Sequence, residues 1–306
     1  MEAEMNKKLL EVLKGKKVTI IGHDECDVDS FISAKLLSNL LNYLNISNSV
    51  VILEQVKEND TYRLVNEIFN INLKDFYCGF EDENRILFLV DHYETNHLGN
   101  VVGCIDHHPN VKNLTYPYYY FRKSCSASYL IYELMQEFGY VPNEIEIKMI
   151  IISMMVDTVA FRSEKTITEE VVVAKSLARK YGIDYKYLEE YSLCLTDIEN
   201  MNISEIINHG VKSYCFNGKK VKSSYLQLWD IPSKEDVNIW LETIKEKLFA
   251  EELEMWVFII FGCKEEDTYE YHVTKDKISM RIDFGKILSR GTNIMPRIER
   301  TFYICH

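Results

Sequence analysis

Short, continuous apolar runs alternate with helix-like segments through the first two-thirds of the chain. The apolar runs are residues 18–21, 50–53, 86–90 and 101–105. Because they are apolar throughout rather than at every second position, we expect strands that are buried on both faces, as in a parallel sheet. Apolar residues recur at helical spacing in the segments 30–44, 60–69, 126–138, 144–155 and 169–181. This alternation predicts an α/β fold with a doubly wound, mainly parallel sheet.

The pattern changes near residue 190, which indicates a second domain. Residues 191–202 are polar and irregular, as expected of a linker. Beyond them, Ser233 can cap a helix, and residues 224–228, 255–261 and 269–273 are strand-like. A chain of 306 residues also exceeds the usual size of one domain. We therefore expect a first domain at 1–190, a linker at 191–202 and a smaller mixed α+β domain at 203–306.

Charge and cysteine usage narrow the classes of partner and compartment. The formal net charge is −12, so a long nucleic acid would be repelled, whereas a small anion bound through metal ions would not. The eight cysteines are scattered without a CxxC pair, which is typical of a reducing compartment and argues against a zinc–thiolate site. No apolar run approaches the roughly 20 residues of a membrane span. We expect a soluble cytoplasmic protein with no membrane partner.

Acidic and imidazole side chains follow three of the predicted strands. They are His23, Asp27 and Asp29 after the first strand, Asp91 after residues 86–90, and Asp106, His107 and His108 after residues 101–105. In an open α/β sheet, ligands bind at the carboxyl ends of the strands, so these side chains should converge on one crevice. A further carboxylate, Asp157, ends an apolar helix that could reach the same place.

Several carboxylates packed together repel one another unless they are protonated, solvated or bound to cations. Asp and His ligands without thiolates suit Mn²⁺ or Mg²⁺ better than structural zinc. Two such ions roughly 3.5–4 Å apart can hold a bridging hydroxide and clamp the oxygens of an in-line displacement at phosphorus. The residue types therefore predict phosphoryl transfer to water.

Each cluster also has a simpler explanation. Asp29 or Ser30 could only cap the following helix, and residues 106–109 could be an ordinary turn. The agreement of three strand ends favours a shared site over three separate structural roles.

The same residues lie in motifs that resemble the DHH phosphoesterase superfamily. The motifs are His23-x-x-x-Asp27-x-Asp29-Ser30, residues 89–92, residues 105–108 with Asp106-His107-His108, residues 156–163, and Ser289-Arg290. The resemblance covers nearly the whole chain. It is closest to the branch with a DHHA2-type second domain, which contains the manganese-dependent (family II) inorganic pyrophosphatases and the exopolyphosphatases. It implies a catalytic DHH domain at 1–190 and a substrate-gripping DHHA2-type domain at 203–306.

The resemblance also implies a role for each site residue. One metal would bind His23, Asp27 and Asp91; the second would bind Asp29, Asp91, His107 and Asp157. Asp91 would bridge two divalent ions, Mn²⁺ with Mg²⁺ or Co²⁺ as alternatives, and Asp106 would orient its neighbours. His108 would contact the substrate and protonate the leaving phosphate. Arg290 and Lys212 of the second domain would grip phosphate oxygens, and a solvated surface lysine is an equal alternative for Lys212.

Two departures from the family pattern leave the substrate open. Gly291 stands where these pyrophosphatases usually have Lys, and Tyr93 stands where they usually have Asn. The leading hypothesis is hydrolysis of pyrophosphate or short polyphosphate. The alternatives are a phosphodiesterase acting on short oligonucleotides or on cyclic or linear dinucleotides, and a non-catalytic regulator that binds metal and anion. A homodimer is implied by the resemblance, and Cys26 could be inert packing or a point of oxidation.

Overall fold

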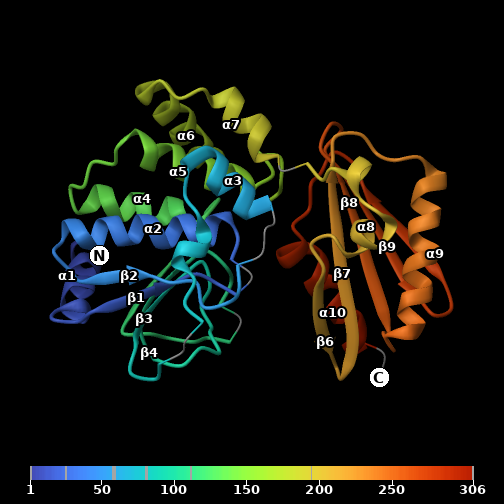
Figure 1. Ribbon diagram of the computed structural model, residues 1–306, viewed down its shortest axis with the longest axis horizontal. Coiled ribbons are helices and arrows are strands. Elements are labelled where there is room, and N and C mark those ends of the chain that lie inside the picture. Colours follow the sequence, from blue (N-terminus) through green and yellow to red (C-terminus); the bar gives the residue numbers. More distant parts are fainter. Residues whose placement is uncertain are drawn as a thin grey trace. The chain divides into compact units, whose positions relative to one another are not determined.

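The structure is a computed structural model that describes residues 2–24, 26–56, 60–79, 82–110, 112–193 and 195–304. Cys194, inside the expected linker, and Cys305 lie outside the described residues. The chain forms two compact units (Figure 1). The first comprises Met1–Phe161 and Lys165–Ser192, and the second comprises Arg162–Glu164 and Leu193–His306.

The first unit contains a five-stranded sheet in which every pair of neighbouring strands is parallel. Its strands are β1 (Val18–Ile21), β2 (Asn48–Val50), β3 (Ile86–Val90), β4 (Asn100–Asp106) and β5 (Tyr118–Phe121), in the order β2-β1-β3-β4-β5. The parallel sheet with its helices confirms the predicted α/β class. Because the chain runs from β1 outward to β2 and then returns to β3, the strand order reverses between β1 and β3, which is where such sheets bind ligands.

The helices of the first unit are α1 (Glu2–Leu13), α2 (Val28–Tyr43), α3 (Asp60–Phe69), α4 (Ala127–Glu137), α5 (Glu144–Asp157), α6 (Thr168–Tyr181) and α7 (Tyr185–Ser192), with a 3-10 turn at Leu73–Phe76. Helices α2 and α4 lie along one face of the sheet (Figure 1). Helix α5 packs against α2 and α4 as well as α6 and α7, which explains why most of its residues are buried. A capping box of Asn143 and Glu146 starts α5, and its last residue is Asp157.

The second unit is built on a mixed five-stranded sheet with the order β10-β9-β8-β7-β6. The strands are β6 (Lys212–Phe216), β7 (Lys219–Leu228), β8 (Met255–Gly262), β9 (Asp267–Thr274) and β10 (Ile278–Asp283). Only the pair β7 and β8 is parallel among these described strands, because the helix α9 (Lys234–Ala250) connects them. Ser233 caps α9 by accepting from the Asp236 amide at 3.1 Å, which confirms the predicted helix start.

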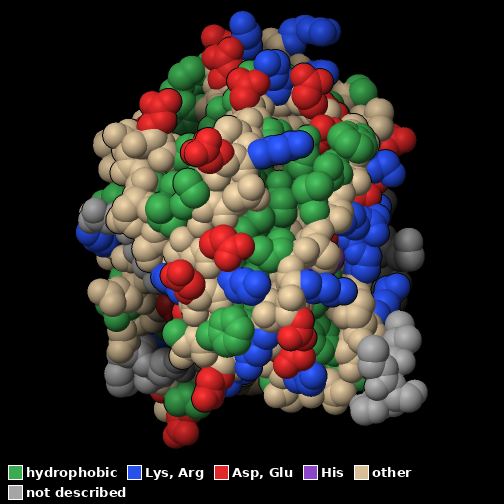
Figure 2. Space-filling view, turned by 90° about the vertical axis from the view of Figure 1, so that its right-hand side faces the viewer, with side chains coloured by type: hydrophobic (Ala, Val, Ile, Leu, Met, Phe, Trp, Pro, Cys, Tyr) green, Lys and Arg blue, Asp and Glu red, His purple; other side chains and the backbone are tan. Residues whose placement is uncertain are grey.

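The core of the second unit lies between the sheet and helices α8 (Ile203–Asn208) and α9. It includes Trp256, Phe258 and Ile260 of β8, all fully buried, packed with Trp240 of α9. Elements that follow β10 are the π-helical segment Arg290–Ile294 and α10 (Met295–Ile304). On the face shown in Figure 2, basic and acidic side chains are interspersed around an apolar area.

Two boundaries differ from the sequence-based expectation. Of the linker expected at 191–202, Tyr191 and Ser192 belong to α7. Leu193 and the described residues 195–202 group with the second unit, where the Thr196 amide donates to the Gln227 carbonyl at 2.7 Å and Asn202 caps α8. Strand β2 ends at Val50 instead of continuing to residue 53, since Ile52 forms an isolated bridge with Tyr77 rather than a ladder position.

Among the described residues, no helix is both long and apolar enough to cross a membrane.

Candidate metal centre

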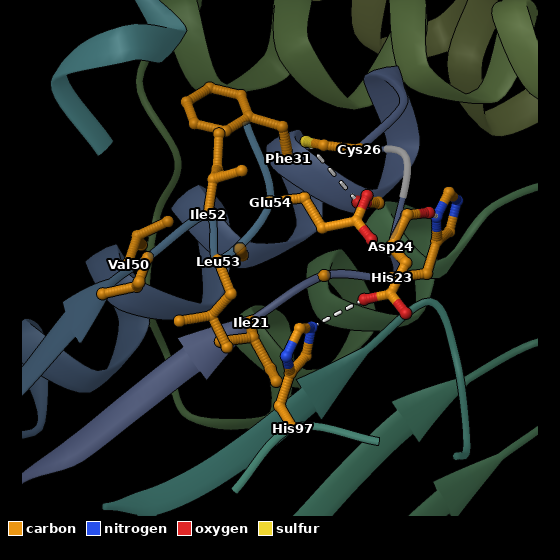
Figure 3. A pocket seen from close by; sticks show the side chains of 14 residues that line it. Ile21, His23, Asp24, Cys26, Phe31, Val50, Ile52, Leu53, Glu54 and His97 are labelled. Atoms are coloured by element: carbon orange, nitrogen blue, oxygen red, sulfur yellow. Dashed lines mark hydrogen bonds and ion pairs between the residues drawn. The ribbon is translucent and has the colours of Figure 1, made fainter. Parts of the chain in front are cut away.

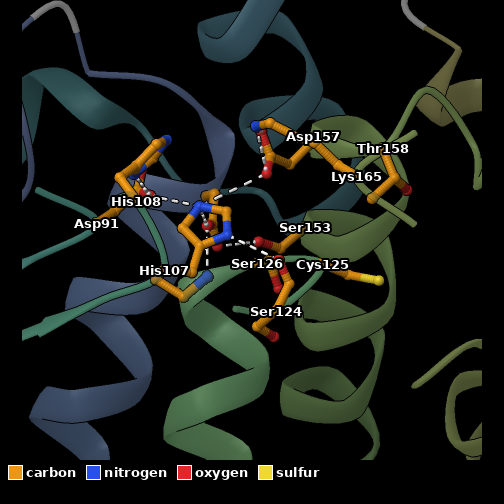
Figure 4. A network of polar contacts seen from close by, with 12 residues as sticks. Asp91, His107, His108, Ser124, Cys125, Ser126, Ser153, Asp157, Thr158 and Lys165 are labelled. Carbon is orange, nitrogen blue, oxygen red and sulfur yellow. Dashed lines mark hydrogen bonds and ion pairs between the residues drawn. The ribbon is translucent and has the colours of Figure 1, made fainter. Parts of the chain in front are cut away.

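The carboxyl ends of β1, β3 and β4 bring the predicted site residues together. The ligand atoms of His23, Asp27 and Asp91, which we call the His23 group, lie within 4.8 Å of one another. Those of Asp29, His107 and Asp157, which we call the Asp157 group, satisfy the same limit, and Asp91 also lies this close to His107 and His108. Figure 4 shows Asp91 and Asp157 on either side of His107.

The ring of His107 is oriented by a backbone carbonyl. Its Nδ1 lies 2.9 Å from the Ser124 oxygen and therefore donates to it, which leaves the lone pair of a neutral ring on Nε2. That Nε2 lies 3.2 Å from Asp91 Oδ1, 3.6 Å from Asp157 Oδ2 and 3.8 Å from Asp29 Oδ2. Neither His107 Nε2 nor Asp91 Oδ1 has a hydrogen-bond partner among the described residues, although both are buried. Two buried, unpartnered ligand atoms facing each other fit a divalent cation.

Asp29 is held by donors from three helices. Its Oδ1 accepts from the Ser128 amide at 3.1 Å, Ser33 Oγ at 3.1 Å and Ser153 Oγ at 2.6 Å, and its Oδ2 accepts from the Ala127 amide at 2.7 Å. The two amides belong to the first turn of α4, where the helix dipole favours a carboxylate. Because Oδ1 is saturated, Oδ2 is the atom that remains to face His107. Burial and the nearby Asp91 raise the pKa of Asp29 to about 7.

The His23 group repeats the same arrangement. His23 Nδ1 is hydrogen-bonded to the Asp24 carbonyl, while Nε2 lies 3.0 Å from Asp27 Oδ2 and 3.6 Å from Asp91 Oδ2. Asp27 has a second role, because its Oδ1 accepts from the Ser30 amide at 3.0 Å and caps α2. The helix cap that was considered for Asp29 or Ser30 is therefore made by Asp27.

The carboxylates of both groups strongly favour a positive charge at this site. Burial by itself would lower the pKa of His23, but Asp27 and Asp91 outweigh it and raise that pKa to about 10. Burial also opposes protonation of His107, yet Asp91 and Asp157 raise its pKa to about 10. Without a cation, protons on the two rings would have to supply the charge that a metal ion can supply instead.

Asp91 lies between the two groups, with Oδ2 toward His23 and Oδ1 toward His107. Its backbone has φ of 64°, a left-handed conformation that non-glycine residues adopt at a cost of about 1 kcal/mol or more. The Asp91 amide donates to the Ile105 carbonyl at 3.0 Å, which ties this turn to the end of β4. The strained turn directs one carboxylate toward both histidines.

Asp106 stabilises the turn that carries the two histidines. Its Oδ1 accepts from the amides of His107 at 2.8 Å and His108 at 3.0 Å, and from His108 Nδ1 at 3.0 Å. Although burial would raise the pKa of Asp106, these contacts with His108 lower it. The His108 side chain is one-third exposed at 34%, so a solute can reach it.

A small pocket lies beside His23 (Figure 3). Its rim contains Asp24 and His97, whose Oδ1 and Nε2 are 2.7 Å apart and connect the loops after β1 and β3. Cys26 also lines it, and burial together with Asp27 raises the pKa of this thiol to about 12. The thiol therefore stays protonated at neutral pH, which favours the inert alternative for Cys26.

Sequence reasoning missed two residues that act on the ligands. Lys165 donates from Nζ to both carboxylate oxygens of Asp157, at 2.7 and 2.9 Å. Glu170 accepts from the Cys125 amide and so fixes the turn that holds His107. No spacing rule marks either residue; the only available signal was that Lys165 lies just beyond the motif at 156–163.

In the second unit, the segments that contain Arg290 and Lys212 lie together. Arg290 Nη1 donates to the Gly210 carbonyl, and its guanidinium lies 5.0 Å from the centre of the Tyr225 ring. Lys212 follows Gly210 by two residues, begins β6 and is exposed. Gly291 has no heavy atom within 4 Å of the position of a Cβ, so a Cβ at this position would meet open space.

Comparisons with known proteins agree with this geometry. The DHH family, N-terminal domain, matches residues 17–161. The manganese-dependent inorganic pyrophosphatase of Bacillus subtilis (strain 168) is 26% identical over 297 residues, covering 92% of this chain and 94% of the relative. The manganese-dependent inorganic pyrophosphatase of Methanocaldococcus jannaschii is 26% identical over 318 residues, covering 92% and 98%.

Solved structures share the fold of both units. A Methanococcus jannaschii structure described as a "putative family II inorganic pyrophosphatase" has a TM-score of 0.72 at 22% identity, covering 94% of this chain and 99% of that one. An exopolyphosphatase-related protein from Bacteroides fragilis has a TM-score of 0.54 at 14% identity, covering 98% and 96%. The parallel sheet and its motif-bearing strand ends therefore lie in the segment, residues 17–161, that matches the DHH family, N-terminal domain.

Proposed function

We propose that the protein is a manganese-dependent phosphohydrolase that cleaves the phosphoanhydride bond of pyrophosphate or short polyphosphate with two divalent ions. The observation that carries the proposal is the pair of buried, unpartnered atoms His107 Nε2 and Asp91 Oδ1, with Asp29 and Asp157 beside them. The names of the curated relatives, which cover nearly the whole chain, support manganese and pyrophosphate.

In this proposal the His23 group would hold one ion and the Asp157 group the other, and the Asp91 carboxylate, which lies between them, would serve both. When bound, the ions would lower the pKa of a water and neutralise charge on phosphate oxygens. The chain's own part is orientation. The Ser124 and Asp24 carbonyls hold the tautomers of His107 and His23, so that each ring presents Nε2 to the ions.

His108 is the proposed proton donor to the leaving phosphate. Its Nδ1 is 3.0 Å from Asp106 Oδ1, which fixes the orientation of the ring. The other ring nitrogen is left for the substrate. We further propose that Lys212 and Arg290 supply phosphate contacts from the second unit, as a point charge and a planar fork respectively.

Phosphate release from purified full-length protein tests the proposal. The chelator-treated protein is assayed with Mn²⁺, Mg²⁺ or Co²⁺ on pyrophosphate, tripolyphosphate, longer polyphosphate and a linear dinucleotide. We expect Mn²⁺-dependent release from pyrophosphate or tripolyphosphate. Release from the dinucleotide alone would favour the phosphodiesterase alternative, and turnover of none would favour a binding regulator.

A pair of variants checks the site itself. Asp91→Ala should abolish activity and reduce bound Mn²⁺, because it removes a carboxylate from both groups. Asp276→Ala, a matched change at an exposed turn of the second unit, should behave as wild type. Wild-type turnover by Asp91→Ala would reject the proposed site.

A further inference from the structure

The ammonium group of Lys165 contacts a carboxylate to which a metal ion would bind. Its Nζ lies 2.7 Å from Asp157 Oδ1 and 2.9 Å from Oδ2, and the two side chains are 17% and 20% exposed. The same Oδ2 is 3.6 Å from His107 Nε2, within the Asp157 group. Figure 4 shows Lys165 and Asp157 meeting on one side of the His107 ring. An ammonium and a metal ion would therefore use the same carboxylate.

The position of Lys165 is set by the fold. Two residues later, the Ile167 amide donates to Cys125 Sγ at 3.2 Å. Cys125 follows Ser124, whose carbonyl accepts from His107 Nδ1 at 2.9 Å. The turn that orients the His107 ligand thus also anchors the loop that carries Lys165. This lysine is held at the site and is not a solvated surface side chain.

Lys165 hydrogen-bonds to Asp157 of the Asp157 group, and its charge also acts on Asp91 and on Asp27 of the His23 group. Asp27 faces the His23 ring at 3.0 Å, and a neutral imidazole can become a ligand by offering its lone pair. Asp157 faces an ammonium, which has three donors and no lone pair. An incoming cation at the Asp157 group is repelled by Lys165 and must break at least one of its two contacts with Asp157.

We propose that Lys165 is a built-in competitor for the divalent ion at the Asp157 group. The His23 group then fills first and tightly, and the Asp157 group fills second and weakly. Activity would respond to the concentration of free Mn²⁺, because the second ion must displace the ammonium from Asp157. This inference rests on the proposed two-ion function and adds a specific residue that sets the affinity of the second ion.

Metal binding without substrate tests the competition. Mn²⁺ is titrated into chelator-treated, full-length protein, and free Mn²⁺ is followed by electron paramagnetic resonance. Wild type should show two classes of affinity. Lys165→Met, which keeps the length and removes the charge, should tighten the weaker class about ten- to a hundredfold, the value of one charge-assisted hydrogen bond. If that variant does not fold, Lys165→Gln should give the same direction.

Matched variants make the interpretation specific. Lys264→Met removes a lysine that is 2.8 Å from Asp230 on the surface of the second unit, and it should change neither class. Lys165→Arg keeps the charge and should leave the weaker class near its wild-type affinity. Asp157→Asn added to Lys165→Met should erase the gain, since the competition is for that carboxylate.

The outcomes separate this inference from the proposed function. Unchanged or weaker second-class binding in Lys165→Met would overturn the competition and would assign Lys165 to the positioning of Asp157. A gain that persists with Asp157→Asn would also overturn it. Failure of wild type to bind Mn²⁺ would reject the metal centre and the proposed function together. Two-class binding without pyrophosphate hydrolysis would reject only the function.

Discussion

Glu170 lies outside the ligand groups, yet its removal should weaken metal binding. Its Oε2 accepts from the Cys125 amide at 2.7 Å and from Ser124 Oγ at 3.0 Å, and its Oε1 accepts from Arg122 at 2.8 Å. The Glu170 side chain is only 3% exposed. Since the Ser124 carbonyl orients His107, a change at Glu170 that shifts the turn at residues 124–125 should also shift the His107 ring.

The expected cost of Glu170→Gln follows from these contacts. The ion pair between Glu170 and Arg122 is left out of the energy sum, because the Arg122 side chain is 38% exposed and exposed ion pairs contribute little to stability. The carbonyl oxygen of Gln can replace Oε2 and accept both remaining hydrogen bonds, but without the negative charge, and its NH₂ group then faces the Arg122 guanidinium. Two hydrogen bonds that lose their charge assistance together cost roughly 2 kcal/mol of unfolding free energy. Mn²⁺ affinity at the Asp157 group should fall about ten- to a hundredfold.

Glu133→Gln provides a matched control for this prediction. Glu133 also pairs with Arg122, at 2.7 Å, but it makes no described hydrogen bond to residues 124–125. Both variants are compared by thermal unfolding in chelator and by Mn²⁺ titration. Wild-type affinity in Glu170→Gln would refute the reasoning. An equal loss in Glu133→Gln would refute it as well, because the effect would then come from Arg122.

Three further results are expected. In chelator, the pKa values of His23 and His107 are raised to about 10, so their contribution to the unfolding free energy should be complete below pH 6.5 and lost as the pH rises towards 10. Urea unfolding at several pH values should show this decrease. Added Mn²⁺ should abolish the decrease. Cys26, whose pKa is raised to about 12, should resist iodoacetamide at pH 8 in chelator while the exposed Cys215 reacts, as measured by mass spectrometry; equal labelling would contradict the assignment. Gly291→Lys should fold normally and lower the KM for pyrophosphate about ten- to a hundredfold relative to Gly291→Met; equal KM values would show that the added charge does not reach the substrate.

The sequence alone determined the α/β class and the place of the candidate site. Continuous apolar runs predicted buried parallel strands, and Asp or His residues at three strand ends predicted one cluster. The reasoning works because parallel strands end at the same edge of a sheet, so position along the chain is enough to bring His23, Asp91 and His107 together. Strand β5 was not predicted, because a short run of tyrosines at a sheet edge lacks the continuous burial of a central strand.

Only the tertiary structure decided what surrounds the ligands. Ser153 is 124 residues from the Asp29 that it contacts, and Glu170 is 45 residues from the Cys125 amide that it accepts from. Helix packing makes these contacts, and no local spacing encodes them. The pairing of Lys165 with Asp157 is of the same kind, since a loop must turn back on the end of α5 to make it. Chain position therefore predicts the candidate ligands, while packing determines their tautomers, charge and competition for the ion.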